Sequence, residues 1–175
     1  FLVKFDKRAK GIEIRNIANG DLPMVWLNPH NFEQMLLNIV INALDAMEPK
    51  KGEGGELHLE VRREYRDEMV EIRVSDTGIG MSREVCRRAF ESFFTTKEIS
   101  KGTGLGLFIS YNLATEIDGT IELDSEPGTG TTVTIRIPSR PKKELISGGS
   151  EESDSAEREA GEGQGHIADA GSAKE

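Results

Sequence analysis

Apolar and polar residues alternate with a period of two in five separate segments of the chain. This alternation predicts five strands, each with one apolar face. A sheet of such strands is covered on one side only, because its polar side chains keep contact with water. The expected strands are centred on residues 12–15, 57–61, 70–74, 121–123 and 133–137.

Three other segments carry the sequence signals of helices. Residues 29–47 follow Asn28, a good cap residue, and have Pro29 at the first helical position. Residues 104–117 form a second expected helix, and residues 82–90 form a shorter one. Helices packed on one face of a mixed, mostly antiparallel sheet give an α/β (α+β) two-layer sandwich.

The composition indicates one folded domain. The 175 residues, 36% of them hydrophobic, can bury one good core. Past Pro141 the chain is poor in apolar residues, and from Ser147 onward it carries a net charge of −6 out of the total of −9. We therefore expect a folded domain over residues 1–140 and a disordered acidic tail or linker over residues 141–175.

Several classes of protein are excluded by the same inventory. The rest of the chain is mildly acidic, so it lacks the basic surface of a nucleic-acid binder. Cys86 is the only cysteine, so no disulfide can form within the chain. The longest apolar run, residues 35–44, is too short to span a bilayer, and no direct membrane contact is expected. Because the chain starts at Phe1 and not at Met, we expect a fragment of a longer protein.

Asn38, Asn42 and Asp45 share one narrow stripe of the expected helix 29–47, whose other directions are almost all apolar. An unpaired buried amide costs about 1–3 kcal/mol, so the stripe must face partners. Two interpretations remain open from this helix alone. Either the amides cap neighbouring loops inside the protein, or their oxygens face a hard cation such as Mg²⁺.

Three glycine clusters follow this helix, at residues 76–80, 102–110 and 128–132. The second leads directly into the expected helix 104–117, whose free N-terminal amides favour an anion such as phosphate, although a single cluster is more often a simple turn. The P-loop and GxGxxG spacings and the HRD and DFG triplets of protein kinases are absent. The segment 90–101 combines three phenylalanines with lysines, which indicates either a lid over a site or ordinary packing of the rings.

Five motifs occur in a fixed order along residues 9–139: QMLLNIVINALDAM, DTGIGM, FESFFTTK, KGTGLGLFIS and EPGTGTTVTIRIP. They resemble the N box, the first glycine box, the F box, and the second and closing glycine boxes of the catalytic ATP-binding domain of sensor histidine kinases. That superfamily, GHKL, has the Bergerat fold and also holds gyrase, the heat-shock chaperone ATPases and the MutL proteins. The short FFTTK segment is similar to that of the nitrogen-regulation-type sensor kinases.

The resemblance implies a site for ATP and Mg²⁺. Asn42 would bind the magnesium ion, with Asn38 one turn earlier lining the same site. Asp76 would accept a hydrogen bond from the adenine amino group, where guanine presents a carbonyl that a carboxylate repels. Lys97 or Lys101 would reach the terminal phosphate. The other implied nucleotide contacts are Gly78 and Gly80 beside the adenine, Thr132 at the same edge, and Gly102, Thr103, Gly104, Leu105 and Gly106 at the phosphates.

The implied activity is transfer of the γ-phosphoryl group of ATP to a histidine, for relay to a response regulator. His30, His58 and His166 lack the acidic neighbours of a phosphoacceptor. The acceptor histidine is therefore expected on a dimerisation domain that this chain does not contain. Without that domain we expect a monomer that is almost inactive, located in the cytoplasm, with a parent protein that can be anchored in a membrane.

Three other functions remain open. An ATPase of the chaperone or gyrase type uses a Glu four residues before the magnesium-binding Asn, and here that position is Asn38, which cannot act as a base. A serine kinase of the anti-sigma-factor type shares the fold and also lacks a phosphoacceptor helix. A degenerate nucleotide-binding module that signals only by conformation would not need Asn42, Asp76 or the second glycine box.

Overall fold

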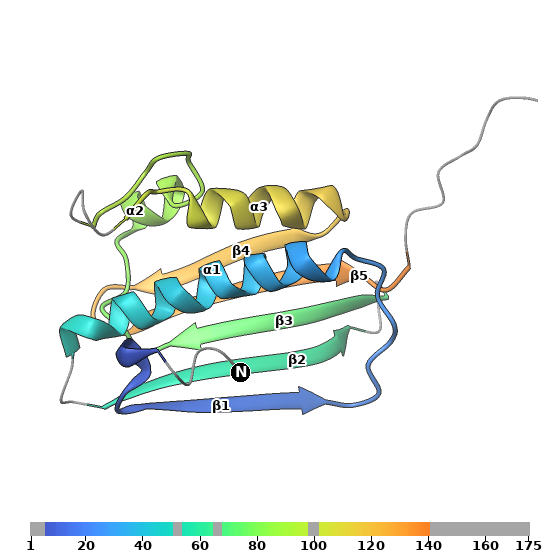
Figure 1. The fold of residues 1–175 in the computed structure, drawn as a ribbon, viewed down its shortest axis with the longest axis horizontal. Coiled ribbons are helices and arrows are strands. Elements are labelled where there is room, and N and C mark those ends of the chain that lie inside the picture. The colour runs from blue at the N-terminus through green and yellow to red at the C-terminus, as the bar shows by residue number, and fades with distance from the viewer. Residues whose placement is uncertain (1–5, 51–53, 65–67, 98–101, 141–175) are drawn as a thin grey trace, which may run out of the picture. The chain divides into compact units, whose positions relative to one another are not determined.

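The computed structural model describes residues 6–50, 54–64, 68–97 and 102–140. This part of the chain contains a five-stranded sheet with the strand order β1-β2-β3-β5-β4 (Figure 1). β1 runs parallel to β2, and the other neighbouring strands are antiparallel. The strands are β1 (Ile12–Asn19), β2 (Gly55–Glu64), β3 (Met69–Asp76), β4 (Thr120–Glu126) and β5 (Gly130–Pro138).

Three α-helices and two short 3-10 helices are the other elements of the described residues. Two of the α-helices, α1 (Pro29–Met47) and α3 (Gly106–Glu116), lie side by side against the sheet, and α2 (Arg83–Arg88) contacts β4. The 3-10 helix η2 (Lys7–Ala9) precedes β1, and η3 (Glu48–Lys50) continues α1. The predicted two-layer sandwich, with a mixed, mostly antiparallel sheet and helices on one face, is confirmed.

The core lies between the apolar face of the sheet and the inner sides of α1 and α3. Alternate residues of each strand reach it, as the period of two predicts. α1 has the bounds that Asn28 and Pro29 indicate, because the Asn28 side chain accepts hydrogen bonds from the first free amides of the helix. The fully buried apolar side chains at the centre are Met35, Ile39, Leu44, Leu57, Val74, Ile135 and Ile137.

α3 begins two residues later than predicted, at Gly106 instead of residue 104. Gly104 has a φ of +67°, in the left-handed region, so it cannot belong to a right-handed helix. The sequence pattern could not separate a glycine that opens a helix from one that turns the chain just before it. All five predicted strands and all three predicted helices are present, with differences of a few residues at their ends.

The second face of the sheet carries charged side chains in cross-strand pairs. Glu71 on β3 is only 3% exposed, yet it lies 2.6 Å from Arg62 on β2 and 3.0 Å from Arg136 on β5. A buried carboxylate is tolerated when it is paired in this way. These ion pairs therefore leave Glu71 with cationic partners on the face of the sheet that the helices do not cover.

No helix among the described residues is both long and apolar enough to cross a membrane. Residues 141–175 lie outside the described residues. The predicted boundary at residue 140 and the predicted acidic tail therefore stay predictions.

Candidate functional site

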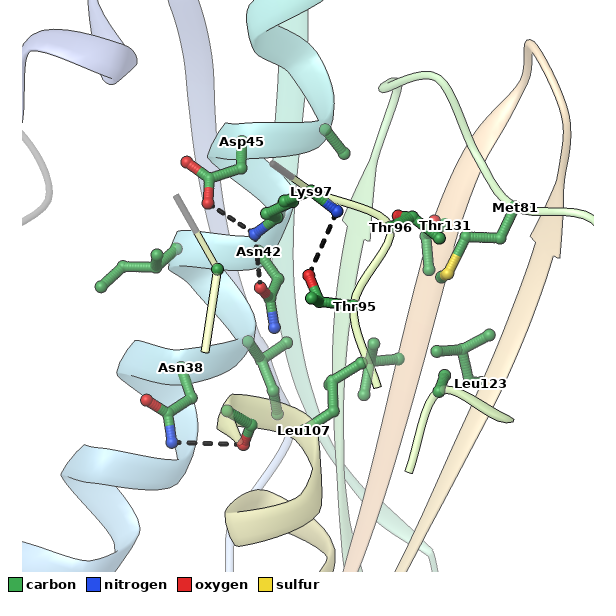
Figure 2. Close-up of a pocket in the computed structure, with 18 of the residues that line it drawn as sticks. Asn38, Asn42, Asp45, Met81, Thr95, Thr96, Lys97, Leu107, Leu123 and Thr131 are labelled. Atoms are coloured by element: carbon green, nitrogen blue, oxygen red, sulfur yellow. Dashed lines mark hydrogen bonds and ion pairs between the residues drawn. The ribbon is translucent and has the colours of Figure 1, made fainter. Parts of the chain in front are cut away.

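A cavity of about 480 Å³ opens between α1, the start of α3, the end of β3, the start of β5, and the segment before Lys97 (Figure 2). It brings together residues from all five motifs of the sequence. Most of the predicted site residues line it: Asn38, Asn42, Asp76, Gly80, Lys97, Gly102, Thr103, Gly104 and Gly106. Gly78, Leu105 and Thr132 are not among the lining residues, and Lys101 lies outside the described residues.

The polar stripe of α1 forms one wall of this cavity. Asn38 Nδ2 donates a hydrogen bond to the carbonyl oxygen of Gly106, at 3.3 Å, and so ties α1 to the first turn of α3. Asn42 Oδ1 accepts a hydrogen bond from Lys97 Nζ at 3.0 Å. The Asn38 amide therefore binds a neighbouring element, as the first interpretation predicts. The Asn42 oxygen faces the ammonium group of Lys97, and the binding of a hard cation there stays a prediction.

Asp45, the third member of the stripe, holds two cations at once. Its Oδ2 atom lies 2.6 Å from Lys97 Nζ, and its Oδ1 atom lies 2.6 Å from Arg8 Nη1. The Lys97 backbone amide is in turn fixed by Thr95, whose Oγ1 atom accepts its hydrogen at 3.1 Å. The lysine expected near the terminal phosphate thus lies in the wall of the cavity, bound to α1.

Asp76 also lines the cavity, at the end of β3. Burial raises the pKa of its carboxyl to about 6, even though the amides of Gly78 and Thr131 and the charge of Lys50 favour the ionised form. The amide of Gly78 donates to Asp76 Oδ1 at 2.8 Å. Lys50 donates to the carbonyl oxygens of Thr77 and Gly128, which fixes the loop after β3. Because its carboxyl is desolvated and the loop after it is fixed, Asp76 is a strong and well-placed hydrogen-bond acceptor.

Gly78 and Gly80 have a packing role in the structure. A Cβ on Gly78 would lie 2.7 Å from the backbone and side chain of Ala46 at the end of α1. Gly80 has a φ of +64°, and a Cβ there would lie 2.0 Å from the carbonyl oxygen of Glu126. Their predicted place beside the adenine stays a prediction.

The second glycine cluster leads into the first turn of α3, which lies close to Asn42. Gly106 is the first residue of α3, and a Cβ there would lie 3.6 Å from Asn42 Nδ2. Leu105, at the N-cap, provides no side-chain hydrogen bond to the first amides of the helix. Thr103 Oγ1 accepts from the Leu105 amide at 3.4 Å. The first turn of α3 therefore keeps amides without a side-chain cap, which suits an anion.

The structure has Thr131, and not the predicted Thr132, on the cavity side of β5. Thr131 lines the cavity and pairs with Asp76 in the register of β3 and β5. Thr132 points to the opposite face of the sheet, where its hydroxyl lies 2.9 Å from the hydroxyl of Ser75. Side chains alternate along a strand, so counting back from the buried Val133 would have selected Thr131.

The three phenylalanines of the segment 90–101 have different environments. Phe90 packs against Tyr111, with ring centroids 5.7 Å apart, and Phe94 lines the cavity under the guanidinium of Arg88. Phe93 is 74% exposed and has a φ of +63°, which is unusual for an aromatic residue. Packing against the core is therefore right for Phe90 alone, since Phe93 is exposed and Phe94 lines the cavity.

Residues 28–141 match the family described as histidine kinase-, DNA gyrase B- and HSP90-like ATPases. The chain is 40% identical over 142 residues to sensor kinase CckA of Brucella abortus, covering 74% of this chain and 15% of the relative. It is 34% identical over 137 residues to sensor histidine kinase ZraS of Escherichia coli, covering 78% of this chain and 28% of ZraS. The chain thus spans between about a seventh and somewhat over a quarter of these relatives.

Solved structures of histidine kinases have a fold similar to that of this chain. The catalytic domain of histidine kinase ThkA superposes with a TM-score of 0.66 at 27% identity, covering 79% of this chain and 89% of that one. Full-length ShkA, solved in complex with AMPPNP, gives a TM-score of 0.64 at 30% identity, covering 75% of this chain and 27% of ShkA. The chain therefore belongs to the family of histidine kinase-, DNA gyrase B- and HSP90-like ATPases. Within it, the relatives named above are sensor kinases, as the five motifs predict.

Proposed function

We propose that this domain binds Mg-ATP and transfers the γ-phosphoryl group to a histidine of a phosphoacceptor domain outside this sequence, for relay to a response regulator. The observation that carries the proposal is the polarity of one cavity. This cavity is lined by a desolvated acceptor, Asp76 on β3, and by a second polar group made of Asn42 and Lys97 beside the start of α3. A base with an exposed amino group, joined to a polyphosphate, matches this polarity.

The residues at the phosphate end fit a magnesium ion. Asn42 Oδ1 already accepts a hydrogen bond from an ammonium group, so its oxygen is turned toward a position suited to a cation. Amide oxygen is a ligand that Mg²⁺ accepts, usually together with water and substrate phosphates. Bound there, the metal would offset the negative charge that the phosphate oxygens carry during transfer.

The chain's own residues would mainly bind and orient the nucleotide. Asp76 would accept from the adenine amino group and would repel the carbonyl that guanine presents instead. The first amides of α3 and the ammonium of Lys97 would hold the phosphates in line with the incoming imidazole. The N–P bond to histidine would form as the bond between the γ-phosphorus and the bridging oxygen breaks, with ADP as the leaving group.

Hydrolysis would be poor in this site. Asn38 stands where the hydrolytic relatives carry a Glu, and its amide already donates to the Gly106 carbonyl oxygen. An amide cannot take a proton from water at neutral pH. The domain would therefore keep its bound ATP intact until an acceptor histidine arrives. The proposal also includes that the domain is a monomer and works in the cytoplasm, where ATP is available.

The test is to mix the chain with magnesium and γ-labelled ATP and to follow the label between ATP, free phosphate and protein. We expect saturable, magnesium-dependent binding with the label remaining in ATP. On addition of a phosphoacceptor domain from a sensor kinase, the label should appear on that domain in an acid-labile form, as phosphohistidine. Rapid release of phosphate would favour an ATPase instead, and an acid-stable label would favour a serine kinase.

Replacing Thr131 by Val should lower the affinity for Mg-ATP about fivefold. The variant loses the hydroxyl that would support the adenine edge, and the loss of one hydrogen bond costs about 1 kcal/mol. The matched variant Thr132→Val removes a hydroxyl from the opposite face of the sheet and should change the affinity less than about twofold. Calorimetric titration of both variants measures the difference. Equal losses in both variants would contradict the corrected position of the threonine.

A further inference from the structure

Arg8, Asp45, Lys97 and Asn42 form a continuous chain of hydrogen bonds along one wall of the cavity (Figure 2 shows its last three members). The distances from Arg8 Nη1 to Asp45 Oδ1 and from Asp45 Oδ2 to Lys97 Nζ are both 2.6 Å. The Asp45 side chain is only 17% exposed, so its two cationic partners compensate for the loss of water. The proposed metal ligand, Asn42, is the last acceptor in the chain.

Both cationic members of this chain are held at other points. Asp6 accepts two hydrogen bonds from the Arg8 guanidinium, at 2.9 and 2.6 Å, and this pairing lowers the pKa of Asp6 to about 2. Arg8 therefore meets Asp45 with a fixed orientation. The stem of Lys97 lies against Gly102, where a Cβ would come within 3.1 Å of Lys97 Cβ. Its ammonium is thus directed to Asp45 and Asn42 by the backbone around it.

We propose that Asp45 is a positioning residue that keeps Lys97 on the Asn42 oxygen and away from the phosphates until metal and nucleotide bind. This inference rests on the proposed function. A divalent cation and an ammonium group repel each other strongly at such separations, so they cannot share the Asn42 oxygen. Binding of the metal therefore releases Lys97 toward the phosphates, and the hold of Asp45 sets how readily this exchange occurs.

The inference makes a definite prediction for ATP without magnesium. In the wild type, Asp45 retains Lys97, and the ammonium contributes little to metal-free binding. In Asp45→Asn the lysine is free to contact the phosphates, and the affinity for ATP in the presence of EDTA should rise about tenfold, the typical size of one charge-assisted hydrogen bond. The factor by which magnesium tightens binding should shrink accordingly.

A double-mutant cycle separates this mechanism from the simple removal of a negative charge. If released Lys97 causes the gain, Asp45→Asn should raise metal-free affinity by less than about twofold in a Lys97→Met background. If charge alone causes it, the tenfold gain persists in that background, and the inference is wrong. Asp124→Asn and Lys10→Met are matched controls, because both residues are exposed and lie outside the cavity.

Arg8 provides a test of opposite sign at a residue that does not line the cavity. In Arg8→Met, Asp45 loses its hydrogen bond to Arg8 and keeps the one to Lys97. The Asp45 carboxylate should then bind the Lys97 ammonium more tightly. Metal-free affinity should then fall about threefold, and the fall should vanish in the Lys97→Met background. An unchanged or raised affinity in Arg8→Met would contradict the inference. Failure of the wild type to bind ATP even with magnesium would instead refute the proposed function.

Discussion

Replacing Asp76 by Asn should abolish nucleotide binding and, at the same time, make the empty domain more stable. The carboxylate is the acceptor proposed for the adenine amino group, and an amide in its place can present an N–H₂ group to another N–H₂ group. A buried donor left without an acceptor costs about 1–3 kcal/mol in addition to the lost bond, so the affinity should fall by about two orders of magnitude or more.

The gain in stability follows from the pKa of Asp76, which burial raises from 3.8 to about 6. A carboxyl with a raised folded-state pKa opposes folding once it is ionised. Its cost is absent below about pH 4, grows as the pH rises toward 6, and is complete above that value. A shift of about two units corresponds to roughly 3 kcal/mol at neutral pH. Asn avoids this cost but lacks the second acceptor oxygen of the carboxylate, so 3 kcal/mol is an upper limit.

Thermal melts of both proteins between pH 4.5 and 7.5, with calorimetry of ATP binding, measure both effects. The stability advantage of Asp76→Asn should be small near pH 4.5 and should grow up to about pH 6.5. Wild-type affinity for Mg-ATP should fall below pH 6, because the protonated carboxyl can no longer accept with both oxygens. Asp124→Asn is the matched control on the exposed edge strand. Unchanged ATP affinity in Asp76→Asn would contradict the pocket assignment.

The sequence predicts the fold of this domain well because its elements carry strong local signals. Period-two alternation marks each strand, and the Asn28 cap with Pro29 marks the start of α1. The same patterns set which side chains face the core, and hence where the polar stripe of α1 lies. The polar stripe and the end of β3 therefore meet at one cavity, as the order of motifs indicates.

The details of the site depend on contacts that no local pattern encodes. Arg8 and Asp45 are 37 residues apart, and Lys97 lies 52 residues beyond Asp45, so their meeting depends on the tertiary packing alone. The sequence marks Asp45 as part of the stripe and Lys97 as a candidate phosphate contact, but it does not predict that Asp45 pairs with Lys97 and Arg8. Thr131 differs from these cases, because strand alternation contained the information needed to select it over Thr132.

The arrangement of α1 separates a structural amide from a functional one. Asn38 and Asn42 are one turn apart on the same face, yet Asn38 donates to a backbone carbonyl and Asn42 presents its oxygen to a movable ammonium. Loss of the Asn38 bond should loosen the contact between α1 and α3. Loss of Asn42 should leave that contact intact and remove a ligand.

Replacing Asn42 by Ala should therefore remove the response to magnesium with little effect on folding. Lys97 keeps its contact with Asp45 in this variant, so the free energy of unfolding should change by less than about 1 kcal/mol. A metal that stabilises charge during transfer contributes several kcal/mol, so phosphotransfer to an added phosphoacceptor domain should fall by about a thousandfold. Metal-free ATP binding should persist.

Titration of ATP with and without magnesium tests this directly, and the ratio of the two affinities is the quantity to compare. In the wild type the ratio should be well above one, and in Asn42→Ala it should approach one. Asn112→Ala is the matched control, because Asn112 is exposed on α3 and does not line the cavity. A ratio that stays at the wild-type value in Asn42→Ala would mean that the metal is held by other groups, and that the ammonium of Lys97 marks no metal position.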